Sequence, residues 1–351
     1  MNYFKKHMFD KFLSRKSPVE EEPAVEEEEV RIDPDKADEL FTLAEFDEKS
    51  SERIAAPRYS YWKSVWKTFF GSKFTVFVAI LVILVISFAF IYPSFFSDYD
   101  PMVAPHINDS SWKYRKPFTT DYEADGTAVF HIFGTDNIGN EVFDVVWEGA
   151  RNSLIVSLAA TAINMVIGIT VGALWGFSKK MDKWMIEIYN VVSNVPFLLL
   201  AMILSYVMKP GFVTLIFIMT VTDWIFVAYF IRTQVMIIRD REYNLASKCL
   251  GTRTGTMITK NILPYLISVI MTYISREVPV LISYEVFLSY MGLGIGSQYA
   301  SLGRTISSYT PYMRGTPHLF WIPVFILAMI SISLYIVGQK LADAADPRTH
   351  R

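Results

Sequence analysis

Three acidic residues lie in stretches of the sequence that are otherwise almost entirely apolar. Asp223 is the single charge in residues 212–231, and Glu277 and Glu285 share a second such stretch with Arg276. A charge at the centre of a membrane span costs about 2.5–3.5 kcal/mol on insertion scales. The three carboxyl groups must therefore face other helices or a wet cavity, and all are candidates for a polar pathway or its gate. A helix-packing hydrogen bond explains Asp223 equally well, Glu277 can pair with Arg276, and Glu285 fits a structural or gating role.

Other residue types that support chemistry lack the spacing that the chemistry needs. No phosphate-binding loop of the form Gly-x-x-x-x-Gly-Lys-Ser/Thr occurs, so we do not expect this chain to bind or hydrolyse ATP. No serine, histidine and acid set suggests an intramembrane protease. Cys249 is the only cysteine, which excludes a disulfide scaffold. No metal site is expected, because the histidines lack the spacing of zinc ligands; they are His7, His106, His131, His318 and His350.

Apolar runs of membrane-spanning length recur along the 351 residues. Only 19% of the residues are charged, compared with about 25% in a soluble domain, and no basic patch points to nucleic acid. A helix of about 20 residues crosses the roughly 30 Å hydrocarbon layer. The expected spans are residues 74–92, 153–177, 188–208, 212–231, 265–290 and 319–338, of which 265–290 contains charges and Pro279.

The distribution of Lys and Arg between these spans predicts the orientation. With the amino terminus in the cytoplasm, the cytoplasmic segments hold 16 Lys and Arg and the external segments hold 7. Positive residues favour the cytoplasmic side, so both termini are expected there. Residues 93–150 then form an external loop, and residues 151–345, which include the loop 239–264, form the helical membrane core.

The amino-terminal residues differ in composition from the rest. Residues 18–53 include fifteen acidic and four basic residues, and such a segment repels itself and buries too little apolar surface to fold. We expect residues 1–55 to be a disordered acidic cytoplasmic tail, acting as a solvated linker or as a docking segment. Residues 56–92 are expected to hold an aromatic, basic amphipathic helix and the first span. That helix either lies along the membrane surface or extends the span.

The loop between the fourth and fifth spans, residues 239–264, has the pattern of two short helices. Helix-forming residues run up to Leu250, and Gly251 can adopt the left-handed conformation that closes a helix. A second helical stretch is expected to stop before Pro264, which cannot continue a helix without losing a hydrogen bond. Ala246 and Ser247 are small enough for another backbone to approach. An ordinary hairpin that packs only on its own bundle is the alternative.

This loop resembles the EAA loop of ABC importer permeases, on which the cytoplasmic ATPases dock. The resemblance rests on two small residues, a glycine four after the second, and Leu-Pro twelve and thirteen after the glycine. Leu245 stands where the general motif has glutamate, which the peptide branch commonly lacks too, and Asn261 stands where it has isoleucine. The resemblance implies ATPase coupling through seven residues: Glu242, Ala246, Ser247, Gly251, Thr252, Leu263 and Pro264.

Other stretches resemble the dipeptide, oligopeptide and nickel permeases, in the same order along residues 60–350. They are residues 97–101, 133–139, 149–154, 285–294 and 341–348. Asn140 and Glu141 depart from the Arg-Asp of the family. The whole is most similar to the second membrane subunit of the oligopeptide branch, permease protein C. Small residues also recur every four positions, which suits close helix packing or a lipid-tolerant helix face; they are Gly168, Gly172 and Gly176.

The resemblance implies an all-α membrane protein with six transmembrane helices and the type I ABC importer permease fold. It also implies a prokaryotic-type importer of the cell membrane, in which a homologous second permease subunit completes the translocation pathway. Two cytoplasmic ATPase subunits would use ATP and Mg²⁺, an external binding protein would deliver the peptide, and this chain would bind no cofactor. A dipeptide or nickel permease is the first alternative. An ion-driven secondary transporter is the second, although no internal repeat is visible.

Overall fold

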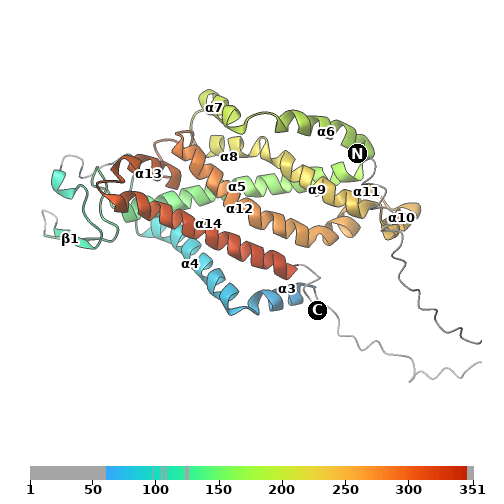
Figure 1. The fold of residues 1–351 in the computed structure, drawn as a ribbon, viewed down its shortest axis with the longest axis horizontal. Helices are drawn as coiled ribbons and strands as arrows, with labels where there is room; N and C mark the ends of the chain where they lie inside the picture. Colours follow the sequence, from blue (N-terminus) through green and yellow to red (C-terminus); the bar gives the residue numbers. More distant parts are fainter. Residues whose placement is uncertain (1–60, 98, 104–105, 107–108, 123–125, 346–351) are drawn as a thin grey trace, which may run out of the picture. The chain divides into compact units, whose positions relative to one another are not determined.

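The computed structural model describes residues 61–97, 99–103, 106, 109–122 and 126–345. The acidic tail expected at residues 1–55 lies outside the described residues. Helices make up most of the described chain (Figure 1). The α-helices are α3 Tyr61–Phe70, α4 Lys73–Phe95, α5 Val142–Phe177, α6 Lys179–Ser193, α7 Phe197–Val207, α8 Phe212–Thr220, α9 Asp223–Arg239, α10 Glu242–Cys249, α11 Thr254–Thr256, α12 Ile267–Tyr290, α13 Leu302–Tyr309 and α14 Pro317–Ala345.

Five helical segments of the described chain are long and apolar enough to cross a membrane, and one bent pair of helices is a sixth candidate. The five are α4, α5, α8 with α9, α11 through α12, and α14, in the order of the predicted spans. α5 begins at Val142 and not near residue 153. Its first turns pack on protein, since Val142, Val146 and Ala150 are fully buried. The helix therefore extends beyond the stretch that hydropathy alone identifies.

The third expected span, residues 188–208, is wrong as one straight helix. The chain instead forms α6 and α7, whose axes differ by 81°. The bend falls at Pro196, which has no N–H to donate and disfavours helical geometry in the residue before it. Pro196 is itself extended, with ψ of 116°. α6 begins at Lys179, so the polar start of this pair lies outside the run that the hydropathy pattern marked.

The expectation that helix ends before Pro264 is also wrong. Helical chain runs through this residue by changing its winding: Met257–Ile262 form a π turn, η3, and Leu263–Leu266 form a 3₁₀ turn, η4, that leads into α12. Pro264 is the second residue of the 3₁₀ turn, a position at which a missing N–H is tolerated. The fifth span is consequently continuous from Thr254 to Tyr290.

The contact between α5 and α9 depends on residues without side chains. A Cβ added to any of three α5 glycines would lie 2.4–2.7 Å from atoms of α9. For the central one, Gly172, the obstacle is the backbone carbonyl oxygen of Ala228. Small residues on one helix face allow this close approach of two backbones. The three are Gly168, Gly172 and Gly176.

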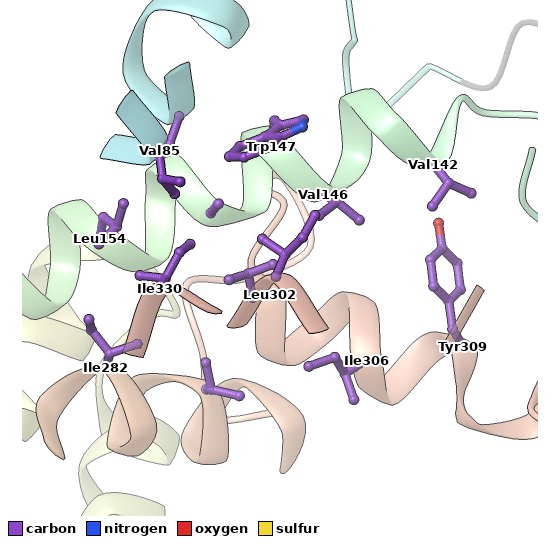
Figure 2. Close-up of a cluster of buried hydrophobic side chains, with 14 of the residues drawn as sticks. Val85, Val142, Val146, Trp147, Leu154, Ile282, Leu302, Ile306, Tyr309 and Ile330 are labelled. Atoms are coloured by element: carbon purple, nitrogen blue, oxygen red, sulfur yellow. The ribbon is translucent and has the colours of Figure 1, made fainter. Parts of the chain in front are cut away.

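A buried apolar cluster joins α4, α5, α12, α13 and α14 (Figure 2). Trp147 of α5 packs edge-on against Phe88 of α4, with ring centroids 4.7 Å apart. From the other side, Leu302 and Ile306 of the short helix α13 fill the space beside α5. The cluster fixes the part of the bundle next to the loop between α4 and α5, which is called the hairpin end below.

The loop at the hairpin end contains a short 3₁₀ turn, η2 Ser110–Trp112, and an antiparallel hairpin. The hairpin pairs β1 Thr119–Tyr122 with β2 Ala128–His131. A second 3₁₀ turn, η5 Thr310–Tyr312, follows α13. At the opposite end of α5, α10 and the start of the fifth span gather (Figure 1).

The amino-terminal amphipathic helix is present as α3. Gly71 and Ser72 separate it from α4, and the Ser72 hydroxyl accepts a hydrogen bond from the Thr75 backbone N–H. α3 is therefore a distinct helix and not an extension of the first span. Val65 and Phe69 pack in a cluster with Ala344 of α14, which ties α3 to the last helix.

Candidate functional site

The helix expected to contact the ATPase is α10, and it is attached to the bundle mainly at its start. Asn244 is fully buried, and its Nδ2 donates a hydrogen bond to the Ile238 carbonyl oxygen at 2.9 Å. Glu242 and Ala246 are exposed. An amide that satisfies the last turn of α9 thus fixes the angle between the two helices, while most of the α10 surface stays uncovered by this chain.

The end of α10 is closed by a Schellman motif. Gly251 has φ of +79°, a left-handed conformation that a residue with a Cβ adopts only at a cost. The Thr252 N–H donates to the Ser247 carbonyl oxygen at 3.1 Å, and the Gly251 N–H donates to the Lys248 carbonyl oxygen at 3.0 Å. These are the two hydrogen bonds of that motif, so the turn has one defined geometry.

A side-chain hydrogen bond joins α10 to the start of the fifth span. Asn261 Nδ2 donates to the Ser247 hydroxyl at 3.3 Å, and that hydroxyl donates to the Tyr243 carbonyl oxygen at 2.9 Å. Asn261 is the residue that departs from the isoleucine of the motif. The Asn261 side chain, which an isoleucine could not replace in this hydrogen bond, links α10 directly to η3.

The uncovered surface of α10 is partly apolar. Leu250 is 87% exposed, and Tyr243 and Leu245 are also exposed. Of the other predicted coupling residues, Thr252 and Leu263 are half-buried and Pro264 is exposed. A rigidly capped helix with exposed leucines next to small residues is suited to a groove on another protein.

Beside α10, a cluster of polar groups fastens α6 and α9 to the end of α5. Asp182 of α6 receives hydrogen bonds from Arg232 Nε at 2.5 Å and from Trp175 Nε1 at 2.8 Å. The Arg232 guanidinium also lies over the Trp175 ring, 5.3 Å from its centroid, in a cation–π contact. Arg239 Nη1 donates to the Gly176 carbonyl oxygen at 2.8 Å. In the sequence, Arg232 and Arg239 counted only toward the excess of Lys and Arg in one loop. Their partners could not be identified there, because they lie on other helices.

The structure brings two of the three acids of the apolar stretches together, half-buried Asp223 and buried Glu277. Asp223, the first residue of α9, and Glu277 of α12 are hydrogen-bonded through their carboxyl groups. Asn164 Nδ2 of α5 donates to Asp223 Oδ2 at 2.6 Å. Glu277 does not form the expected ion pair with its neighbour Arg276, which is exposed. Glu277 hydrogen-bonds Asp223 and Tyr273 instead. Three helices therefore meet at one polar point inside the bundle.

Glu285 lies apart from this pair, near the hairpin end. It is fully buried, and its Oε1 accepts a hydrogen bond from the Ser289 hydroxyl at 2.7 Å. Ser153 of α5 also hydrogen-bonds Glu285 and receives the Leu302 N–H of α13 at 3.2 Å. Glu285 is thus part of the polar contact that joins α5, α12 and α13.

The loop at the hairpin end holds a buried aspartate that the sequence analysis did not single out. Asp136 Oδ1 accepts the backbone N–H groups of Ile138 and Asn140, both at 2.9 Å, and Oδ2 accepts the Tyr309 hydroxyl at 3.2 Å. Burial raises the pKa of the Asp136 carboxyl, although these hydrogen bonds oppose the shift. Burial likewise raises the pKa of Tyr309 well above its usual value and that of Tyr99 to about 12.

His131 occupies a second buried position in the same loop. Its Nδ1 contacts the Glu141 carboxylate, and its Nε2 lies 3.1 Å from Asp121 Oδ2, which also pairs with Arg115 Nε at 2.7 Å. Glu141 is the residue before α5, and burial raises its pKa. The partners of this histidine are carboxylates on the hairpin and at the start of α5, so its role is to hold the hairpin to the bundle.

Two family models match the chain. One describes the inner membrane component of binding-protein-dependent transport systems and matches residues 165–351. The other describes the N-terminal transmembrane domain of oligopeptide transport permease C and matches residues 60–117. The two models together include α3, α4, the last part of α5 from residue 165 and everything after it.

Curated relatives are similar over nearly the whole chain. The oligopeptide transport system permease protein AmiD of Streptococcus pneumoniae is 48% identical, over 89% of this chain and 98% of the relative. The oligopeptide transport system permease protein OppC of Bacillus subtilis is 32% identical over 89% and 98%. The dipeptide transport system permease protein DppC of the same organism is 31% identical over 90% and 94%.

A solved structure shares the fold. A crystal form of the MetNI methionine ABC transporter in an inward-facing conformation matches with a TM-score of 0.50 and 17% identity, over 57% of this chain and 96% of that chain. The capped helix α10, the five or six candidate spans and the two family models all indicate a membrane subunit of a transport system. This chain is a multi-pass membrane protein that belongs to the family of inner membrane components of binding-protein-dependent transport systems, the permease subunits of ABC importers.

Proposed function

We propose that this chain is one of two permease subunits of an ATP-driven importer for oligopeptides. A homologous subunit completes the pathway, two cytoplasmic ATPases dock under the α10 ends, and an external binding protein delivers the peptide. Both termini are cytoplasmic, and ATP and Mg²⁺ are used by the ATPases. The observation that carries the proposal is α10, a rigidly capped helix with an exposed apolar surface, in a chain 48% identical to an oligopeptide permease.

The contacts of α10 suggest how an ATPase would act on the pathway. Asn244 connects α10 to α9, and Ser247 with Asn261 connects it to the fifth span. A groove that closes on α10 and moves it would therefore displace α9 and α12 together. Such a rigid-body change between two arrangements of packed helices is the usual form of a transport switch.

Uptake of labelled peptides by a strain that lacks only this chain tests the proposal. Oligopeptides, dipeptides and nickel are offered separately, and the strain is complemented with the wild-type chain or with none. We expect oligopeptide uptake to need the chain. Uptake of oligopeptides at the wild-type rate without the chain would contradict the proposal.

Dipeptide import is the second candidate function, since DppC of Bacillus subtilis is 31% identical over 90% of this chain. The same uptake measurement separates the two. Loss of dipeptide uptake with unchanged oligopeptide uptake would favour the second candidate.

A further inference from the structure

A chain of polar side chains crosses the interior of the apolar bundle, from α5 through α9 to α12. Asn164 is fully buried and donates to Asp223 Oδ2 at 2.6 Å. Asp223 is hydrogen-bonded to Glu277, which is buried, and Glu277 is hydrogen-bonded to Tyr273. Met165 and Val227, close in sequence to Asn164 and Asp223, belong to a buried apolar cluster formed by the same three helices.

Contact between two carboxyl groups restricts the protonation states that they can adopt. An ionised carboxylate has only acceptor oxygens, so two ionised groups cannot hydrogen-bond each other. Two like charges in contact inside a membrane would also repel strongly, and paired carboxyl groups elsewhere avoid this by keeping one proton. We propose that Asp223 and Glu277 form a buried proton-binding site that holds one proton between them.

The surrounding groups fit a pair with a single negative charge. The Asn164 amide donates to Asp223, and Asp223 is the first residue of the 17-residue helix α9, where the helix dipole favours a negative charge. From α12, Tyr273 hydrogen-bonds Glu277, and Arg276 acts on it through its charge. These groups stabilise a single negative charge on the pair.

The position of the site gives the proton a consequence for movement. Asp223 follows the break between α8 and α9, and Pro279 lies two residues after Glu277 within α12. The chain turns between α8 and α9 beside Asp223, and Pro279 removes one backbone hydrogen bond from α12 without breaking the helix. The bound proton holds α9 to α12 at this point, whereas its loss leaves two carboxylates facing each other and favours their separation.

Infrared spectroscopy of the full-length chain in lipid nanodiscs tests the site directly. A protonated carboxyl group has a C=O stretch separate from those of carboxylates and amides. Glu277→Gln and Asp223→Asn should each remove the same band at neutral pH, because the new amide N–H supplies the hydrogen that the proton supplied. The matched control is Glu187→Gln, a substitution of an exposed acid on α6, which should leave the band unchanged.

The double variant is the decisive measurement. If one proton is shared, Asp223→Asn with Glu277→Gln loses no more band intensity than either single variant. A twofold larger loss would show two separately protonated acids, and no loss in any variant would show two ionised ones; either result overturns the proposal.

The proposal stays testable if these variants do not fold, as judged by gel filtration. A chain with both Glu285→Gln and Asp136→Asn then removes the two other buried acids of the described residues. A carboxylic-acid band that persists in it at neutral pH and shifts in D₂O supports the site, and its absence overturns it. Neither result depends on which cargo the importer carries.

Discussion

Gly251 is the residue whose backbone sets the direction of the chain after α10. A Cβ there would touch nothing within 4 Å, yet φ is +79°. The cost of a substitution is therefore purely conformational, about 1–2 kcal/mol for a non-glycine residue in this region. Gly251→Val should keep the spans inserted at normal abundance but misplace the turn and lower peptide import at least several-fold. Membrane abundance and uptake measured in the same cells check this.

Gly255→Val is the matched control for that prediction. Gly255 is also exposed and its Cβ would also meet nothing within 4 Å, but its φ is not positive. A cysteine at Thr252 in a Cys249→Ser background should crosslink to the ATPase in the wild-type complex, and Gly251→Val should weaken that crosslink. Full import by Gly251→Val, or no crosslink in the intact complex, would contradict a docking role for α10.

Asp136 should make the stability of the hairpin end depend on pH. Because burial raises its pKa in the folded chain, the folded state binds more protons than the unfolded state just above the usual carboxyl pKa. Stability should therefore fall as pH rises through that interval. Asp136→Asn should flatten this dependence of stability on pH, because an amide does not titrate. The variant should still fold, since the Asn Oδ1 can accept both backbone N–H groups and its Nδ2 can donate to the Tyr309 hydroxyl oxygen.

Thermal unfolding across a pH series checks this second prediction. Glu187→Gln, an exposed acid on α6, is the control and should leave the slope unchanged. An equal slope for wild type and Asp136→Asn would show that the carboxyl group does not titrate as its burial indicates.

Hydropathy identifies best the helices that have the same apolar surroundings along their whole length. α4 and α14 agree closely with the expected spans because lipid-facing helices need apolar residues along their whole length. Hydropathy missed the buried start of α5 and the 81° bend at Pro196, where protein contacts or proline geometry decide. At Pro264 the error came from the rule that proline ends a helix, because the chain continues there through a 3₁₀ turn. In each case the deciding contact comes from an element distant in sequence or from a single missing N–H.

The candidate sites divide in the same way. The end of α10 followed from one glycine and its spacing, which is local information. The pairing of Asp223 with Glu277, and of Asp182 with Arg232, joins residues 50 or more positions apart, so no local pattern contains it. The free-energy cost of a charge inside a membrane span showed only that these acids needed partners, not which partners they have.

The contact between α5 and α9 is the element most sensitive to a small change. A Cβ at Gly172 would lie 2.4 Å from the Ala228 carbonyl oxygen and 2.9 Å from the Ala228 Cα, both backbone atoms. Overpacking of this kind costs about 1–3 kcal/mol, and here it must separate two helices. Gly172→Ala should lower the melting temperature of the purified chain.

Gly315→Ala is the control for the packing prediction, since a Cβ there meets nothing within 4 Å. Its melting temperature should equal that of the wild type. A Gly172→Ala chain as stable as Gly315→Ala would mean that α9 can move away from α5 without loss, contrary to a close backbone contact.

At the scale of the whole molecule, the topology depends on whether the bent pair α6–α7 crosses the membrane. If it does, five spans separate the loop at residues 121–126 from the carboxyl terminus, and the two points lie on opposite sides. If the pair only dips in and returns, four spans separate them and they lie on the same side. Six basic residues in the segment 232–264 favour a crossing, because a returning pair would place them outside, against the tendency of Lys and Arg to remain in the cytoplasm.

We therefore expect a reporter inserted at residues 121–126 to be external and one fused after Arg351 to be cytoplasmic. A cysteine at Gly211, between α7 and α8, supplies the third point, in a Cys249→Ser background. A Cβ there meets nothing within 4 Å, so the substitution fits. It should react with an impermeant thiol reagent added to whole cells, whereas a cysteine at Ser178, between α5 and α6, should not. Labelling of Ser178→Cys but not Gly211→Cys would show that the orientation is reversed. Protection of both, with both reporters on the external side, would show that the pair turns back within the membrane.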